Sequence, residues 1–125
     1  MKLLGRKKKP RYQKPSRKIL ETFPNPASGN YEVQHTCLEF TSLCPITGQP
    51  DFGQVSILYS PRDLCLETKS LKYYLFSYRN SAAFMEKVVN QIRDDLVAVL
   101  NPNRLEVVGK FNVRGGICSN IKCTL

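Results

Sequence analysis

The sequence predicts an α+β fold, in which a four-stranded antiparallel sheet carries two helices on one of its faces. The length of 125 residues is that of a single domain. Four stretches are typical of strands, mainly because hydrophobic and polar side chains alternate along them: residues 31–40, 54–59, 104–112 and 117–124. Two stretches instead repeat hydrophobic side chains every three or four positions, as amphipathic helices do: residues 69–80 and 82–100. The predicted order is therefore β-β-α-α-β-β, without an internal repeat.

The chain begins with a strongly basic segment. Residues 1–18 hold nine of the 19 Lys and Arg side chains and none of the ten Asp and Glu side chains, so the net charge of +9 belongs to this segment. Runs of like charge are usually disordered, and we expect residues 1–18 to form a solvated arm in front of a single domain over residues 19–125. Contact with nucleic acid or anionic lipid is the alternative. Residues 19–29 contain two prolines and a glycine and are expected to form an irregular lead-in.

The first half of the domain is expected to be a pair of strands. The strand over residues 31–40 leads into a loop over residues 42–53, because two prolines and two glycines fall there. The second strand covers residues 54–59. Residues 60–63 then form a turn, and residues 64–66 are a short strand extension.

The second half is expected to hold both helices and the last two strands. Ser81 is the expected N-cap of the second helix, and Asn101–Pro102 ends it. A Gly-rich turn at 114–116 connects the strands over 104–112 and 117–124. Since two helices cover only one face of the sheet, the other face should be polar and contiguous, and it should carry Glu32, Gln34, Gln54, Ser56, Glu106 and Lys110. Free sheet edges invite pairing with other copies, and a ring of such sheets would enclose a polar lumen.

Composition excludes several classes of protein. The five cysteines form no CxxC pair, and there is one histidine, His35, so neither a disulfide framework nor a metal site is expected. Cys65, Cys118 and Cys123 are expected to be small apolar residues, and the sequence leaves a redox role for them open. No hydrophobic run approaches the ~20 residues of a membrane span, and no signal peptide is expected. The expected compartment is the cytosol, without membrane contact.

Cys44 lies in the loop Leu-Cys-Pro-Ile-Thr-Gly-Gln-Pro-Asp, seven residues before Asp51. A cysteine becomes a nucleophile when its surroundings lower the pKa of the thiol. A carboxyl group across a rigid loop can donate a proton to the group that the sulfur attacks. The alternative is a buried apolar cysteine beside a turn aspartate, and spacing alone does not decide between the two.

The start of the first predicted helix is the second candidate site. Lys69 and Lys72 lie three residues apart, on one face of the first turn. Two ammonium groups beside helix N-terminal amides favour phosphate binding. Glu67 could accept hydrogen bonds from an amide-like or guanidine-like ligand edge. The alternative is a solvated helix start.

Three segments together resemble the NADPH-dependent 7-cyano-7-deazaguanine reductases of queuosine biosynthesis: EFTSLCPITGQPDFG (39–53), ETKSLKYYLFSYRN (67–80) and GKFNVRGGI (109–117). The resemblance covers roughly residues 21–117. It implies the tunnelling fold, or T-fold, whose subunits form two stacked rings with active sites between subunits. It also implies reduction of a nitrile, 7-cyano-7-deazaguanine (preQ0), to the aminomethyl compound (preQ1). No metal is required.

The resemblance implies a role for individual residues. Cys44 matches the nucleophile that forms a thioimidate with the nitrile, and Asp51 matches the proton donor. The residues that match the binding site for the base are Leu66, Glu67, Thr68, Met85 and Glu86. Met85 stands where the family usually has a histidine, which puts the route of the proton in doubt. The residues that match contacts to NADPH are Thr68, Lys69, Lys72, Arg114 and Gly115.

Further expectations follow from these roles. Nitrile to amine is a four-electron reduction, so two NADPH molecules are needed per turnover. Replacing Lys69 or Arg114 is expected to raise the KM for NADPH while leaving covalent capture by Cys44 nearly unchanged.

Two other functions remain open. Archaeal relatives with the same Cys–Asp pair are amidinotransferases that act on the nitrile of a base within tRNA, and the basic arm mildly favours that activity. The segment Glu67–Tyr74 favours the reductase instead, and tRNA binding is not expected. A non-catalytic ring-forming protein is the third possibility.

Overall fold

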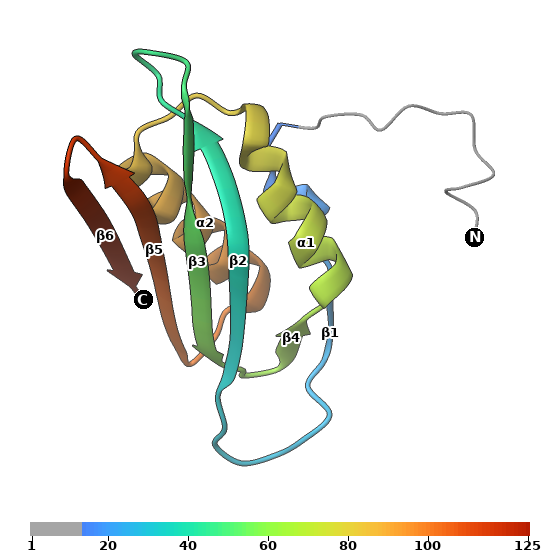
Figure 1. Ribbon diagram of the computed structural model, residues 1–125. Helices are drawn as coiled ribbons and strands as arrows, with labels where there is room; N and C mark the ends of the chain where they lie inside the picture. Colours follow the sequence, from blue (N-terminus) through green and yellow to red (C-terminus); the bar gives the residue numbers. More distant parts are fainter. Residues whose placement is uncertain (1–13) are drawn as a thin grey trace, which may run out of the picture.

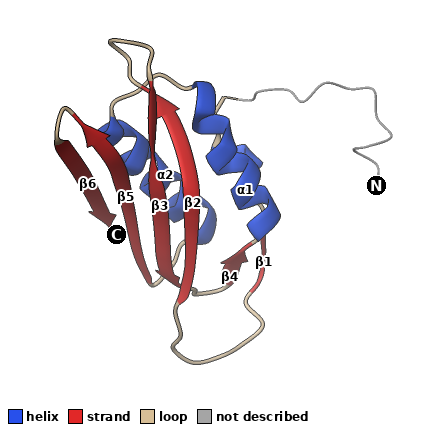
Figure 2. Ribbon diagram, viewed as in Figure 1, coloured by secondary structure: helices blue, strands red, loops and turns tan. Residues whose placement is uncertain are grey.

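The predicted α+β fold is confirmed by a computed structural model, which describes residues 14–125 (Figures 1 and 2). The main sheet is antiparallel, with the strand order β2-β3-β5-β6. Its strands are β2 (Val33–Leu43), β3 (Pro50–Ser60), β5 (Arg104–Arg114) and β6 (Ile117–Thr124). Two helices, α1 (Thr68–Phe76) and α2 (Met85–Leu100), pack on it. Because β2 and β6 each have one neighbour within residues 14–125, both edges of the sheet are free in the described part of the chain.

The core lies between α2 and the inner face of the sheet. The hydrophobic stripe of α2 is buried at every position that points to the sheet, including Val88, Ile92 and Leu96. On the sheet, Val55 and Ile57 of β3 are fully buried, while the residues between them face outwards. The hydrophobic side chains that recur with a period of about 3.6 in α2 and with a period of 2 in β3 therefore pack together in one apolar layer.

A second, two-stranded sheet was not predicted. β1 (Thr22–Pro24) pairs antiparallel with β4 (Leu64–Leu66), and the short 3₁₀ helix η1 (Arg17–Ile19) precedes it. The expected irregular lead-in over residues 19–29 is thus wrong for its first part, and residues 64–66 do not extend the main sheet. Strands of three residues are too short to display a period, so only tertiary pairing reveals them.

The expected loop over residues 42–53 is much shorter, because the two strands continue into it. Ser42 pairs with Asp51, and Leu43 pairs with Pro50, so the loop is confined to residues 44–49. Pro50 is tolerated because it is the first residue of its strand. Gly53 lies so close to the backbone of Lys110 that a β-carbon would not fit there. The prolines and glycines therefore mark the strand ends and a close strand approach instead of a long loop.

The helix boundaries also differ from the prediction. The first helix leaves α geometry at Phe76 and continues as the 3₁₀ helix η2 (Ser77–Asn80). The second begins at Met85 with Phe84 as its N-cap, so the expected N-cap at Ser81 is wrong. The backbone of Ser81 accepts a hydrogen bond from Leu43 instead, at 3.0 Å. Tertiary pairing with β2 thus holds Ser81 outside the helix.

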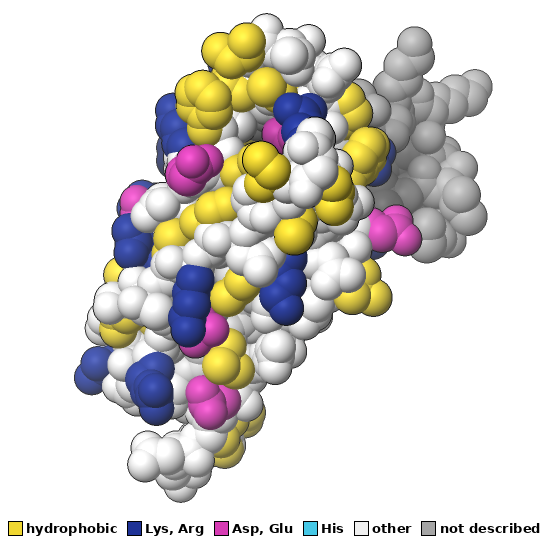
Figure 3. Space-filling model, turned by 60° about the vertical axis from the view of Figure 1, so that its left-hand side comes forward, with side chains coloured by type: hydrophobic (Ala, Val, Ile, Leu, Met, Phe, Trp, Pro, Cys, Tyr) yellow, Lys and Arg dark blue, Asp and Glu magenta, His cyan; other side chains and the backbone are white. Residues whose placement is uncertain are grey.

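The outward face of the sheet is polar at several of the expected positions, but it is not polar throughout, because Leu38, Phe52 and Val113 are also exposed. The side chains of Gln34, Gln54 and Lys110 are exposed there. The Gln34 amide donates to the Ser56 hydroxyl across the β2–β3 pair at 3.1 Å. Figure 3 shows charged, polar and hydrophobic side chains mixed over much of the view towards β5 and β6, with hydrophobic side chains gathered at its upper end. That end carries the β2–β3 loop and the β5–β6 turn.

The N-terminal segment is joined to the helices by a buried polar cluster. Most of the predicted arm, residues 1–13, lies outside the described residues. Arg17 forms an ion pair with Asp95, whose side chain is 1% exposed (Nε–Oδ1 3.2 Å). The Tyr74 hydroxyl donates to the other oxygen of Asp95 at 2.6 Å, and the Tyr78 hydroxyl lies 2.8 Å from that of Tyr74. Burial is the main cause that raises the pKa of Tyr74, so its hydroxyl remains a donor.

Among residues 14–125, no helix is both long and apolar enough to cross a membrane.

Candidate active site

In the tight loop between β2 and β3, two backbone hydrogen bonds hold Cys44 in place. The Cys44 amide donates to the carbonyl of Gln49 at 2.8 Å, and the Gly48 amide donates back to the carbonyl of Cys44 at 2.9 Å. Gly48 has a φ of 71°, a left-handed conformation that glycine adopts without strain. The loop backbone is therefore fixed on both sides of the thiol.

This loop lowers the pKa of the Cys44 thiol to about 7. The largest cause is the hydroxyl of Thr47, followed by the backbone amides of Thr47 and Ile46, which all stabilise the thiolate. The guanidinium of Arg114 adds a smaller effect in the same direction. A thiol with a pKa near 7 is about half ionised at neutral pH, which is the state a nucleophile needs.

Asp51 is the second group at this end of the sheet. It is 7% exposed, and its carboxylate pairs with the guanidinium of Arg114 (Oδ1–Nε 3.1 Å). Asp51 is the second residue of β3, and Arg114 is the last residue of β5. Strand pairing brings these two ends together, because Gly53 is paired with Phe111 and both strands run on beyond that pair. Cys44, Asp51 and Arg114 thus form one cluster.

The start of α2 lies at the same end of the molecule. Ala82 forms a parallel bridge with Leu43, the residue before Cys44, and the Ala83 amide donates to the carbonyl of Leu43 at 3.1 Å. Met85 and Glu86 follow directly after this bridge. Met85 packs against the edge of the core, while the side chain of Glu86 is exposed in the first turn of the helix.

Glu67 is the N-cap of α1, and its side chain occupies backbone amides that were expected from the sequence to bind a phosphate. Its two carboxylate oxygens accept the amides of Lys69 and Ser70, at 2.7 and 2.6 Å. These backbone hydrogen bonds lower the pKa of Glu67, so it is held as a carboxylate. The N-terminal amides of this helix are therefore occupied and not free for a phosphate. What remains for an anion is the pair of exposed ammonium groups of Lys69 and Lys72.

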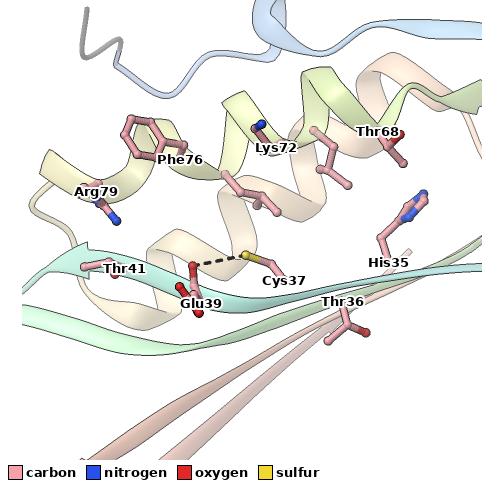
Figure 4. A pocket seen from close by; sticks show the side chains of 11 residues that line it. His35, Thr36, Cys37, Glu39, Thr41, Thr68, Lys72, Phe76 and Arg79 are labelled. Atoms are coloured by element: carbon pink, nitrogen blue, oxygen red, sulfur yellow. Dashed lines mark hydrogen bonds between the residues drawn. The ribbon is translucent and has the colours of Figure 1, made fainter. Parts of the chain in front are cut away.

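A groove of about 310 Å³ runs between β2 and α1 (Figure 4). Thr68 and Lys72 line it from the helix, and His35 and Cys37 point into it from the strand. Nε2 of His35 is buried there without a hydrogen-bond partner in residues 14–125, and burial lowers the pKa of this histidine. Arg79 closes the far end. Two of the expected cofactor residues thus border a half-open groove.

The expected site residues fall into two groups, which lie at opposite ends of the main sheet. Leu66 lies beside Tyr59, whose hydroxyl accepts its amide at 2.9 Å. Tyr59 is eight residues from Asp51 along β3, or roughly 26 Å at ~3.3 Å per residue. In Figure 1, the β2–β3 loop and the start of α1 lie at opposite ends of the sheet. The groups around Cys44 and around Glu67 therefore cannot contact one small ligand within a single chain.

Sequence reasoning did not single out Thr47, which has the largest effect on the Cys44 thiol. The signal was present, since a hydroxyl three residues after a cysteine in a short turn can reach back to the sulfur. It also did not place Arg114 next to Asp51. No local pattern joins residues 63 positions apart, so that contact required the sheet pairing.

Comparison with known families gives a match over residues 50–125, to the family described as QueF-like protein. Curated relatives named NADPH-dependent 7-cyano-7-deazaguanine reductase are similar over most of the chain. The protein of Streptococcus thermophilus is 55% identical over 116 residues, which is 92% of this chain and 71% of the relative. That of an Anaeromyxobacter species is 56% identical over 99 residues, covering 78% and 81%. That of Magnetococcus marinus is 50% identical over 113 residues, covering 90% and 88%.

A solved structure shares the fold at lower sequence identity. It is the apo form of an archaeosine synthase described as QueF-Like, with a TM-score of 0.70 and 25% identity. The match covers 74% of this chain and 91% of that one.

Proposed function

The chain belongs to the QueF-like family, and on that premise we propose that it is an NADPH-dependent reductase of 7-cyano-7-deazaguanine. The observation that carries the proposal is the Cys44 thiol with a pKa of about 7 in one cluster with Asp51, in a chain 50–56% identical to reductases of that name. A nucleophilic thiolate beside a carboxyl group is the minimum that addition to a nitrile needs.

In the proposed reaction, the sulfur of Cys44 forms a bond to the nitrile carbon. One carbon–nitrogen π bond breaks, and its electron pair goes to the nitrogen. Asp51 takes the proton of the Cys44 thiol and passes it to that nitrogen, and the product is a thioimidate on Cys44. After the first reduction, the carbon–sulfur bond breaks, and the Cys44 thiolate leaves an imine that is reduced to the amine.

NADPH supplies the two hydrides, one for each reduction. The residues that would hold such a ligand are Lys69 and Lys72, which are exposed on α1, and the guanidinium of Arg114 from a neighbouring copy, which is 40% exposed. Thr68 and Gly115 stand beside these cations in the sequence. Three positive charges suit a pyrophosphate and a 2′-phosphate.

We propose that the base is held by two carboxylates, Glu67 and Glu86. The cap fixes the carboxylate of Glu67 by two backbone amides and keeps it charged, while each oxygen retains a lone pair for a ligand N–H. Leu66 and Thr68 flank it, and Met85 contributes an apolar wall next to Glu86. Methionine carries no proton, so proton transfer falls to Asp51 in this proposal.

We also propose that the site forms between two copies of the chain. The separation of Cys44 from Glu67 along β3 supports this, because the base must meet both. Free edges at β2 and β6 support it as well, since each offers unpaired backbone groups to a neighbouring subunit. The two stacked rings that the resemblance implies satisfy both conditions.

The alternative is the amidinotransferase activity suggested by the archaeosine synthase. That likeness rests on 25% identity, whereas the curated relatives at 50–56% identity are named reductases. The exposed cations on α1 also have a use in a reductase that a reaction without NADPH lacks. We therefore propose the reductase alone and still expect no specific tRNA binding.

The test is oxidation of NADPH after addition of 7-cyano-7-deazaguanine, with two NADPH consumed per nitrile. Cys44→Ala should abolish both the turnover and the covalent adduct detected by mass spectrometry. Asp51→Asn should retain binding of the base and lose activity by ~10²–10⁴. Cys118→Ala, at an exposed cysteine on β6, is the matched control and should behave as wild type. An adduct that persists in Cys44→Ala, or wild type that oxidises no NADPH, would overturn the proposal.

A further inference from the structure

Arg114 lies between the two groups that the proposed reaction uses. Its Nε is 3.1 Å from Oδ1 of Asp51, and the same guanidinium lies near enough to Cys44 to lower the pKa of the thiol slightly. Asp51 is 7% exposed, whereas the side chain of Arg114 is 40% exposed. The guanidinium therefore pairs with a nearly buried carboxylate while part of its own side chain stays exposed to solvent.

This arrangement matters because two anions share one cation. A buried carboxylate without a countercharge is strongly unfavourable, and an uncompensated carboxylate close to a thiol disfavours the thiolate. With Arg114 in place, the carboxylate of Asp51 and the thiolate of Cys44 can both be charged at the same end of the sheet. Without Arg114, the negative charge of Asp51 would disfavour the thiolate form of Cys44.

We propose that Arg114 is a positioning residue, which holds Asp51 and Cys44 together in the ligand-free protein and keeps both ready for reaction. The reaction itself is the one under the proposed function, on which this inference rests. The new element is the step at which Arg114 acts: it prepares the nucleophile and the proton donor before any cofactor is bound.

The other groups around the cluster are mostly uncharged. The loop contributes the hydroxyl and amide of Thr47 and the amide of Ile46. Asp51 comes from β3 and Arg114 from β5, and the segment that bridges to Leu43 leads into α2 with Glu86 in its first turn. In the described part of the chain, Arg114 is thus the cation that pairs with Asp51 and also lowers the pKa of the Cys44 thiol.

This inference revises one expectation from the sequence. Lys69 and Arg114 were expected to affect NADPH alone and to leave covalent capture by Cys44 unchanged. For Lys69 that expectation stands, because α1 begins at the other end of the sheet. For Arg114 it conflicts with the ion pair to Asp51, and capture itself should become slower when Arg114 is replaced.

The first test needs neither nitrile nor cofactor. Alkylation of Cys44 by iodoacetamide is followed by peptide mass spectrometry from pH 5 to 9. At pH 6, Arg114→Met should react roughly five- to tenfold more slowly than wild type, because the carboxylate of Asp51 is no longer compensated. Arg114→Lys, which keeps the charge, should recover most of the rate. Lys110→Met, which removes one exposed charge from the same strand, is the control and should match wild type.

A double variant separates positioning from a general structural effect. Asp51→Asn combined with Arg114→Met should return the alkylation rate to within about twofold of wild type, since the opposing charge is gone. The proposal is overturned if Arg114→Met follows the pH profile of Lys110→Met. It is also overturned if the double variant stays as slow as Arg114→Met.

The second test uses the proposed substrate. Arg114→Met and Lys69→Met should both raise the KM for NADPH, but only Arg114→Met should slow adduct formation measured without NADPH. Equal rates of capture in these two variants would overturn the proposal. Because alkylation is independent of the reaction, a protein that reduces no nitrile but shows the predicted alkylation profiles would refute the proposed function and not the positioning role of Arg114.

Discussion

The pKa of the Cys44 thiol is lowered mainly by uncharged donors. Thr47 and the loop amides lower its pKa more than Arg114 does. A pKa of about 7 suits a nucleophile that works near neutral pH, because a much lower pKa would also reduce the intrinsic nucleophilicity of the sulfur. At this pKa, a substantial fraction of Cys44 is thiolate near neutral pH, and the sulfur keeps most of its intrinsic nucleophilicity.

Thr47→Val tests this at the residue scale. Valine keeps the shape and the backbone amide of Thr47 but removes the hydroxyl, so the pKa of Cys44 should rise. Since the thiolate is the reactive form, alkylation should be about three- to tenfold slower below pH 7 and equal to wild type well above both pKa values. Rates of iodoacetamide labelling against pH measure this. Cys118 in the same samples is an internal reference, and a profile that does not move would contradict the role of Thr47.

At the scale of elements, a polar cluster fixes the two helices relative to each other. Asp95 of α2 accepts hydrogen bonds from Tyr74 of α1 and from Gln91 of its own helix, and it pairs with Arg17. A buried carboxylate is stabilising only when its donors are all in place. The cluster therefore joins α1, α2 and the segment around Arg17 in the interior.

Tyr74→Phe should destabilise the fold by about 1–3 kcal/mol, because it removes the 2.6 Å donor and leaves Oδ2 of Asp95 less well satisfied in the interior. Urea unfolding followed by circular dichroism measures the change. Tyr73→Phe removes a hydroxyl from the same helix at a partly exposed position and should be nearly neutral. Equal stability of the two variants would show that the hydrogen bond to Asp95 contributes nothing.

For the whole molecule, the distribution of the site residues is the main constraint. Cys44 and Asp51 lie at one end of the sheet, and Glu67 lies near the other, beyond Tyr59. A single base can contact both groups only if each comes from a different copy. The fold therefore links the proposed activity to assembly.

Complementation tests this link. Cys44→Ala and Glu67→Gln should each be inactive, whereas co-expression of both should restore about a quarter of wild-type activity, because random mixing makes one in about four heterologous interfaces intact. Specific activity of the purified mixture measures this. Cys44→Ala mixed with Asp51→Asn is the control and should remain inactive, since these residues come from the same chain. Activity equally low in both mixtures would contradict a shared site.

Much of the fold could be predicted from the sequence because periodicity reports which face of an element is buried. The alternation in β3 and the stripe in α2 are local signals, and they gave the element order and the polar outer face. The segments around Cys44 and Glu67 identified the family for the same reason, since each is contiguous. The strands β1 and β4 could not be predicted, because three residues do not establish a period.

By itself, the sequence determined the α+β class and the element order, and it proposed Cys44 and Asp51 as the reacting pair, because each of these depends on residues close together in the chain. The tertiary structure alone decided that Arg114 pairs with Asp51 and that Ser81 is held outside the helix by Leu43. It also decided that Glu67 lies far from Cys44. These facts depend on which strand ends meet, and that is set by the pairing of the whole sheet, to which distant segments contribute together.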